Sequence, residues 1–303
     1  MHRSGTSAVT RLLSIAGAKL PKTLLVPSSS NPTGHWEPHP LVRYHDALFS
    51  KLGSRWDDWR VLTGLTAARQ KKIRRDLQAI LRAEYGNASL FVVKDPRICR
   101  IAPVFLEALA NANFKVRAVL PFRNPREVMS SLRRRNRLSH TDSAVLWMRC
   151  VLDAEAATRE NIRSFVSFDT LLMDWKACFR RLSTQLDLSW TATAEMKREV
   201  ESFLAASRRP THEIDQDYAF PVIKDWISEI HSALSALQLD PGNRASLATL
   251  DQVRDTLNLA TPILTHAAEL DRQLVGMRAS TSWRITAPLR WIKQKFLFWS
   301  VRR

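Results

Sequence analysis

Three short apolar runs, each followed by a helical segment, constrain the fold of this chain more than any other feature. The runs lie at 90–93, 116–122 and 165–168. Each has the composition of a buried strand, and the repeated order of strand and helix predicts a parallel α/β sheet flanked by helices. Ligands of such sheets bind at the carboxyl ends of the strands. The pattern places Lys94, Arg123 and Asp169 at those ends, and Asp169 could also cap the helix behind it.

The first residues of the chain predict an anion-binding loop. The string His2–Ser7 is small, polar and glycine-containing, and it runs into an amphipathic helix over 8–16. Backbone N–H groups and the positive end of the helix dipole suit a bound anion at such a helix start. A fixed charge from Arg3 and hydroxyl donors from Thr6 and Ser7 add to this attraction. A P-loop of the nucleoside triphosphatases would need a first glycine and a lysine, and the string lacks both.

The loop is not preceded by a strand in this sequence. A strand normally delivers the chain into a phosphate-gripping loop, and here only Met1 comes before it. Such a strand would lie centrally in the sheet, and its loss would leave neighbouring backbone groups unpaired. We therefore expect a sheet without its first strand. A start codon assigned too far downstream explains this as well as a true loss does.

A second candidate anion site combines Arg123 with Ser131. Arg123 leaves the end of a predicted strand, and Ser131 lies eight residues later, about two turns into the next helix. Both side chains can then face one phosphate group near the opening loop. Asn124 can cap that helix, and Pro125 suits its first position. Taken alone, a surface arginine beside an ordinary helical serine is the better interpretation.

The net charge of +17 predicts binding to something anionic, which could be a small ligand, a membrane surface or nucleic acid. No aromatic residues alternate with Arg133–Arg135, which favours a solvated helix face or attraction of an anionic ligand over nucleic-acid binding. Cys99, Cys150 and Cys178 form no CxxC pair, so neither a disulfide framework nor a zinc site is expected. Without an apolar run of about 18 residues or a signal-peptide core, we expect a cytoplasmic protein.

The C-terminal third of the chain is helical in pattern, with helical spacing at 193–206, 219–238 and 260–277. The last stretch, 278–303, holds seven arginine or lysine residues and no acidic residue, with aromatic residues between them. This make-up is typical of an interfacial helix on a membrane, and a helix packed on the domain surface fits it about as well. We expect three parts: an α/β domain at 1–205, a helical extension packed on it at 206–277, and a basic amphipathic tail at 278–303.

Together these motifs resemble the sulfotransferase superfamily, whose members transfer a sulfuryl group from 3′-phosphoadenosine 5′-phosphosulfate to an acceptor hydroxyl or amine. Arg3-Ser4-Gly5-Thr6-Ser7 is similar to the family's 5′-phosphosulfate loop, and Arg123 with Ser131 resembles its 3′-phosphate motif, spacing included. Lys94-Asp95-Pro96 resembles a lysine-containing strand end of the family. Phe168-Asp169-Thr170-Leu171 resembles a strand–helix junction whose first residue is tyrosine in the family. The resemblance covers about residues 1–205.

Within the superfamily, the order of the motifs is most similar to bacterial members associated with glycan modification. The segment 282–290 resembles, more weakly, a tail of bacterial glycosyltransferases and surface-polysaccharide enzymes. The resemblance implies a sulfotransferase fold and O-sulfation of a carbohydrate or lipid-linked glycan, at the inner face of a membrane. It implies 3′-phosphoadenosine 5′-phosphosulfate as the donor, with no metal ion. The donor-binding residues that it implies are Arg3, Ser4, Gly5, Thr6, Ser7, Lys94, Arg123 and Ser131.

The acceptor hydroxyl needs a base within hydrogen-bond reach, and three candidates lie shortly after the first helix. Glu37 is the first choice because it resembles a catalytic glutamate of some family branches, although it could be an ordinary carboxylate ahead of Pro38. His35 and His39 are the alternatives, since histidine titrates near neutrality. Lys94 could neutralise the leaving phosphate. The candidate catalytic residues are therefore Glu37, Lys94 and His35.

Other residues near these motifs have a structural and a functional interpretation. Asp95 is expected to orient a neighbouring cation, Lys94 or Arg97, rather than to take a proton. Tryptophan is more often a core residue than a stacking platform. The tryptophans that could stack on a sugar or on adenine are Trp36, Trp56 and Trp59. The alternative function is a non-catalytic nucleotide-binding or membrane-docked scaffold of a glycan-assembly complex, which the missing strand favours.

Overall fold

The computed structural model describes residues 1–28, 31–190, 193–207 and 221–290. The chain divides into two units, Met1–Asp255 and Thr256–Arg303. The first unit holds the sheet and both anion motifs of the sequence. The part boundaries expected at 205 and 277 stay predictions.

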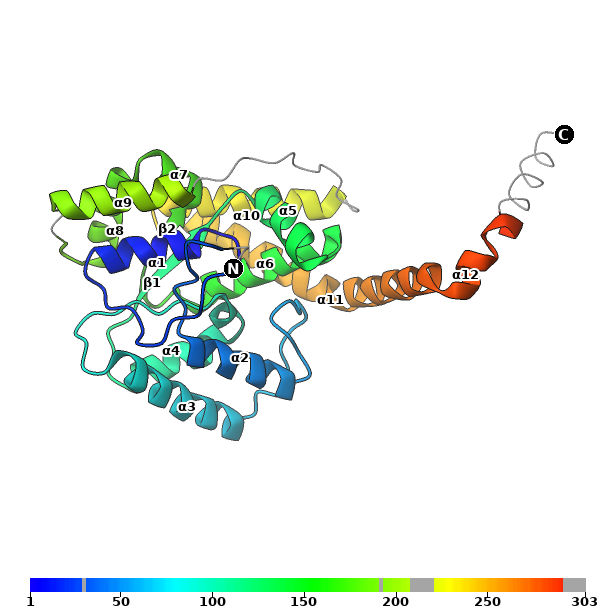
Figure 1. Ribbon diagram of the computed structural model, residues 1–303, viewed down its shortest axis with the longest axis horizontal. Helices are drawn as coiled ribbons and strands as arrows, with labels where there is room; N and C mark the ends of the chain where they lie inside the picture. Colours follow the sequence, from blue (N-terminus) through cyan, green and yellow to red (C-terminus); the bar gives the residue numbers. More distant parts are fainter. Residues whose placement is uncertain (29–30, 191–192, 208–220, 291–303) are drawn as a thin grey trace. The chain divides into compact units, whose positions relative to one another are not determined.

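A small parallel sheet of two strands lies in the first unit (Figure 1). The strands are β1 (Arg117–Phe122) and β2 (Ile162–Ser167), in register from Arg117 beside Ile162 to Phe122 beside Ser167. Between them the chain forms α5 (Pro125–Asn136) and α6 (His140–Ala157), because a parallel pair needs a crossover connection. The predicted α/β class is confirmed, in a unit that is mostly helical.

The predicted strand at 90–93 is not a regular strand. Leu90–Val93 is extended but forms only an isolated bridge, in which Lys19 N donates to Leu90 O at 3.0 Å and Val92 N donates to Lys19 O at 3.1 Å. An apolar run becomes a regular strand only where a neighbour offers a ladder of backbone partners, and none of the described residues offers one here. The expectation of three paired strands is therefore wrong.

Two groups of helices surround the sheet, each with its own apolar cluster (Figure 1). The first group comprises α1 (Thr6–Ile15), α7 (Phe168–Met173), α8 (Trp175–Leu186) and α9 (Ala194–Ser207). The second comprises α2 (His39–Lys51), α3 (Ala67–Tyr85) and α4 (Ala102–Ala110), the last preceded by the 3-10 helix η1 (Pro96–Ile101). A further helix, α10 (Pro221–Leu239), packs against β2. The candidate site lies where the loops leading into α1, η1 and α5 meet.

Local capping rules set the helix starts at the strand ends. Asn124 Oδ1 accepts a hydrogen bond from Arg126 N at 3.0 Å, so Asn124 caps α5 as expected. The helix that follows β2, α7, is capped by Ser167, whose hydroxyl accepts from Thr170 N at 3.4 Å. The expectation that Asp169 caps this helix is therefore wrong. Since β2 ends at Ser167, one residue before the predicted end, Asp169 lies inside the first turn, where its charge suits the helix dipole.

The second unit contains the C-terminal part of α11 (Arg244–Ala279) and α12 (Thr281–Ile285). The helix expected at 260–277 is part of this 36-residue helix, which continues through Pro262. The described part of the predicted tail includes Trp283, which is 37% exposed and lies 3.8 Å from the Arg290 guanidinium. Residues 291–303 of the tail lie outside the described residues. No helix in the described ranges is long and apolar enough to cross a membrane.

Candidate functional site

The opening loop turns sharply into α1, and Gly5 makes the turn possible. Gly5 has φ +82°, and its carbonyl accepts from Ala8 N at 3.0 Å and from Val9 N at 3.1 Å. A Cβ atom at this position would lie 2.5 Å from Phe168 Cδ2, so no larger residue fits without a shift. The first N–H groups of α1, those of Thr6 and Ser7, have no acceptor within the helix and are free to meet an anion.

A hydrogen bond joins the two anion motifs. Arg3 Nε donates to Ser131 Oγ at 2.7 Å, across 128 residues of sequence. Ser131 lies on α5 and is 8% exposed, so the contact is largely shielded from water. The loop and the motif that follows β1 therefore form one site.

Arg123 follows β1 and is held beside the opening loop. Its guanidinium forms an ion pair with Glu127 and lies over the Phe168 ring, 5.0 Å from the centroid. Phe168 thus lies close to both Arg123 and Gly5. The Nε–H group of Arg123 is buried and has no hydrogen-bond partner among the described residues, which leaves a charged donor for a ligand.

Lys94 connects the loop with the candidate base. Its ammonium group donates to Glu37 Oε1 at 2.5 Å, to the His35 carbonyl at 2.9 Å and to Ser7 Oγ at 3.3 Å. The residue is 9% exposed. Burial lowers the pKa of Lys94, and the negative charge of Glu37 opposes that shift. All three ammonium protons are engaged inside the site.

Glu37 is a buried carboxylate, 4% exposed, between two cations. Besides Lys94, the guanidinium of Arg97 lies 3.8 Å from Glu37 Oε2. Burial raises the pKa of Glu37, while Lys94 opposes the rise. A carboxylate with a raised pKa is a better proton acceptor at neutral pH than an exposed one.

The two histidine candidates differ in their placement. His35 lines the candidate cavity, and its Nε2 atom lies 3.0 Å from Ser28 Oγ. Burial and the nearby charge of Lys94 lower the pKa of His35 to about 4, so its ring is neutral at pH 7. His39 is the first residue of α2 and lies outside the cavity wall that the described residues form.

The cavity between these groups has a volume of about 370 Å³. The predicted donor-binding residues that line it are Arg3, Gly5, Thr6, Ser7, Lys94 and Arg123, and the candidate bases that line it are Glu37 and His35. Ser4 is fully buried and lies outside this wall, and Ser131 takes part only through Arg3. Arg135, in the last turn of α5, adds a further positive charge to the wall.

Sequence reasoning missed a buried chain of contacts next to Lys94. His45 is fully buried on α2, and its Nδ1 atom lies 2.7 Å from Asp95 Oδ2. Asp95 accepts from Arg97 Nη1 at 3.0 Å and caps η1 by accepting from Arg97 N, so it orients Arg97. Burial disfavours the charged form, but the His45 hydrogen bond and Arg97 hold the pKa of Asp95 well below its usual range. No sequence signal near His45 marked it.

The tryptophans have structural contacts and lie outside the cavity wall formed by the described residues. Trp59 Nε1 donates to Asp142 Oδ1 at 2.9 Å. Trp36 lies 4.7 Å beneath the Arg11 guanidinium. Trp56 packs on His2 at a ring separation of 4.5 Å, and His2 does line the cavity.

Among the described residues, no group of three or more histidine, cysteine or acidic side chains could hold a metal ion. Cys99, Cys150 and Cys178 are buried and free. No family model, curated protein or solved structure matches this chain.

Proposed function

We propose that this protein is a sulfotransferase that moves a sulfuryl group from 3′-phosphoadenosine 5′-phosphosulfate to a hydroxyl of a carbohydrate or lipid-linked glycan. The observation that carries the proposal is the hydrogen bond between Arg3 and Ser131, which unites two separate anion motifs at one cavity. A donor with phosphate groups at two positions needs two such groups of donors. The choice of a glycan as acceptor rests on the motif resemblance.

The size and the charge of the cavity support this choice of donor. Its volume of about 370 Å³ falls in the range of small-molecule sites, roughly 300–1,000 Å³. The N–H groups at the start of α1, with Arg3 and Lys94, would hold the 5′-phosphosulfate. Arg123, with its unpaired Nε–H group, would hold the 3′-phosphate.

Sulfuryl transfer places clear demands on the remaining groups. The acceptor oxygen forms a bond to sulfur while the bond from sulfur to the bridging phosphate oxygen breaks, and adenosine 3′,5′-bisphosphate leaves. Lys94 and the loop N–H groups would stabilise the charge that grows on the leaving phosphate. Glu37 would accept the acceptor's proton, because its carboxylate is buried beside Lys94 with a raised pKa.

Calorimetric titration of the full chain with adenosine 3′,5′-bisphosphate tests the donor site. We expect Arg123→Ala to weaken binding by roughly 10- to 150-fold, since a charge-assisted hydrogen bond contributes about 1.5–3 kcal/mol. The matched control is Arg134→Ala, an exposed arginine on α5, which should change the affinity less than twofold. Circular dichroism of both variants checks that they are folded.

Two results would count against the proposal in different ways. No nucleotide binding by the wild-type chain would exclude the donor site. Nucleotide binding without transfer of labelled sulfate to any of a panel of glycans would favour the non-catalytic scaffold. In that case wild type and Glu37→Gln would both bind the nucleotide and would both fail to transfer sulfate.

A further inference from the structure

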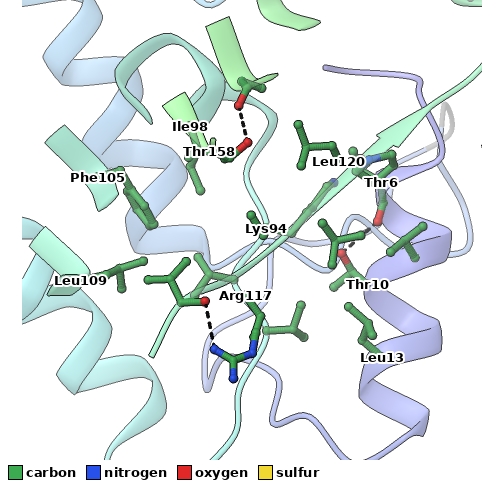
Figure 2. A pocket seen from close by; sticks show the side chains of 18 of the residues that line it. Thr6, Thr10, Leu13, Lys94, Ile98, Phe105, Leu109, Arg117, Leu120 and Thr158 are labelled. Carbon is green, nitrogen blue, oxygen red and sulfur yellow. Dashed lines mark hydrogen bonds between the residues drawn. The ribbon is translucent and has the colours of Figure 1, made fainter. Parts of the chain in front are cut away.

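The two units differ in how far their apolar side chains are buried. In the first unit, apolar helix faces point inward even around a cavity of about 590 Å³, where Thr10 and Leu13 of α1 face Phe105 and Leu109 of α4 (Figure 2). Leu13, Phe105 and Leu109 are all buried. In the second unit, five large apolar side chains of α11 are between 46% and 80% exposed. They are Leu259, Ile263, Leu270, Leu274 and Met277.

Most of these exposed side chains follow the spacing of a coiled coil. From residue 260 to residue 277, apolar residues recur at alternating intervals of three and four. This 3.5-residue repeat places them at the a and d positions of successive heptads, along one narrow seam of the helix. A helix that packs on the surface of a domain has a wider apolar face. The seam consists of six half-buried or exposed residues, which are Ala260, Ile263, Ala267, Leu270, Leu274 and Met277.

The composition of α11 indicates that the helix depends on a covered seam. The helix contains Pro262 and Gly276, which are the two residue types that disfavour an α-helix most. Packing of an apolar face, rather than intrinsic propensity, stabilises most helices in water. A contiguous apolar surface that is exposed to water also marks a site of interaction. The seam is therefore the surface on which a partner of α11 would pack.

Charge distinguishes between a membrane and another protein as the partner of the seam. The whole chain carries +17, but residues 256–277 contain only two acidic residues and one arginine. The side of α11 opposite the seam presents Thr261, Thr265 and Glu269. A helix that lies on an anionic membrane carries lysine and arginine on that side. Two copies of this nearly neutral segment can instead approach each other without strong repulsion.

We propose that the seam of α11 forms a parallel, two-stranded coiled coil with a second copy of this chain. Such a seam is self-complementary, because a twofold axis brings each of its residues against the same residue of the other copy. The flanking positions support the parallel direction. Leu259 lies at a g position and Leu264 at the next e position, and these two positions face each other across a parallel pair. Leu259 of one copy therefore packs on Leu264 of the other.

A parallel dimer brings two copies of the predicted basic tail to the same end of the coiled coil. Each copy has seven arginine or lysine residues in 278–303. When two such tails are joined, a weak attraction of each one to an anionic surface becomes a much stronger attraction of the pair. The inference does not depend on sulfuryl transfer, because it uses only the exposure, the spacing and the charge of residues in α11.

Sedimentation equilibrium of the full chain at high salt, which screens the charges of the tail, tests the dimer. We expect twice the mass of one chain for wild type. Leu270→Lys should raise the dissociation constant about 100-fold or more, because the dimer loses two buried leucines and gains two facing charges. The matched control is Leu239→Lys, which makes the same change at the exposed end of α10 and should dimerise like wild type. A monomeric wild type, or equal dissociation constants for Leu270→Lys and wild type, would overturn the proposal.

Disulfide cross-linking in the full chain tests the direction of the two helices. Met277→Cys places a thiol at a d position near one end of the seam, so the two thiols of a parallel dimer face each other and should link on mild oxidation. Glu269→Cys, outside the seam, should not link, and neither should wild type, whose three cysteines are buried. A dimer that Met277→Cys does not link would overturn the parallel arrangement. Neither measurement involves a nucleotide, so a failure here leaves the proposed activity untouched.

Discussion

Replacing Gly5 with alanine measures how tightly the opening loop is constrained. Gly5 has φ +82°, and an added Cβ atom would lie 2.5 Å from Phe168 Cδ2 and 2.9 Å from Phe168 Cβ. The left-handed backbone alone costs alanine about 1–2 kcal/mol. Displacing Phe168 adds about 1–3 kcal/mol, as at other overpacked sites. We therefore expect Gly5→Ala to lower the free energy of unfolding by about 2–5 kcal/mol.

Gly53 provides the matched control. It has φ +66°, and no heavy atom lies within 4 Å of an added Cβ atom. Gly53→Ala therefore isolates the backbone cost of about 1–2 kcal/mol. Urea denaturation of the full chain, followed by circular dichroism, gives both values, and their difference is the cost of displacing Phe168. Equal losses for the two variants would refute this reasoning.

The same substitution should affect ligand binding, because Phe168 also supports Arg123. The Arg123 guanidinium lies 5.0 Å from the centre of the Phe168 ring, so a shift of the ring disturbs both anion motifs. Under conditions where Gly5→Ala is folded, we expect its affinity for adenosine 3′,5′-bisphosphate to fall at least tenfold. Gly53→Ala should bind like wild type. Unchanged affinity in Gly5→Ala would show that Phe168 does not couple the two motifs.

The remaining predictions concern two buried acids and the tail. Burial raises the pKa of Glu37 above its ordinary value of about 4.3, so the transfer rate should fall as the pH drops through this raised pKa. In a labelled-donor assay, Glu37→Gln should lower kcat by about 100-fold or more. His45 and Arg97 outweigh burial and depress the pKa of Asp95, which therefore contributes stability above about pH 3.9 that is lost as the pH falls through the folded-state pKa. In urea denaturation measured at several pH values, Asp95→Asn should weaken the fall of the unfolding midpoint in acid. The same dependence of the midpoint on pH in Asp95→Asn and wild type would contradict this prediction. The chain should bind vesicles that contain phosphatidylglycerol, and this binding should weaken at high salt and disappear when residues 278–303 are deleted. If the full chain does not bind even at low salt, the tail is not an interfacial helix.

The features that could be predicted from the sequence depend on neighbours in the chain or on simple sheet geometry. Asn124 caps α5 because its side chain reaches a backbone N–H group two residues away. Lys94 and Arg123 meet at one cavity, as expected for residues at the carboxyl ends of neighbouring extended segments, and the opening loop places Arg3 at the same cavity. Local chemistry and the order of elements were sufficient for these conclusions.

The features that the sequence could not show depend on partners far along the chain. Leu90–Val93 has the composition of a strand, but its regular pairing depends on a neighbour that the described residues do not provide. His45 lies 50 residues from Asp95, and its helical surroundings do not mark it as a partner. Phe168 was notable only as a departure from tyrosine, and its contacts with Gly5 and Arg123 arise from the fold.

The three acceptors of Lys94 have a consequence for the order of events in the proposed reaction. Without a donor, the positive charge of the Lys94 ammonium is balanced by the negative charge of Glu37. An arriving phosphosulfate competes for that ammonium, and both its own negative charge and the weakened pairing with Lys94 raise the pKa of Glu37 further. The carboxylate thus becomes a stronger base when the donor is in place. Donor binding and proton affinity are linked in this site, and the substrate itself would prepare the base that the acceptor needs.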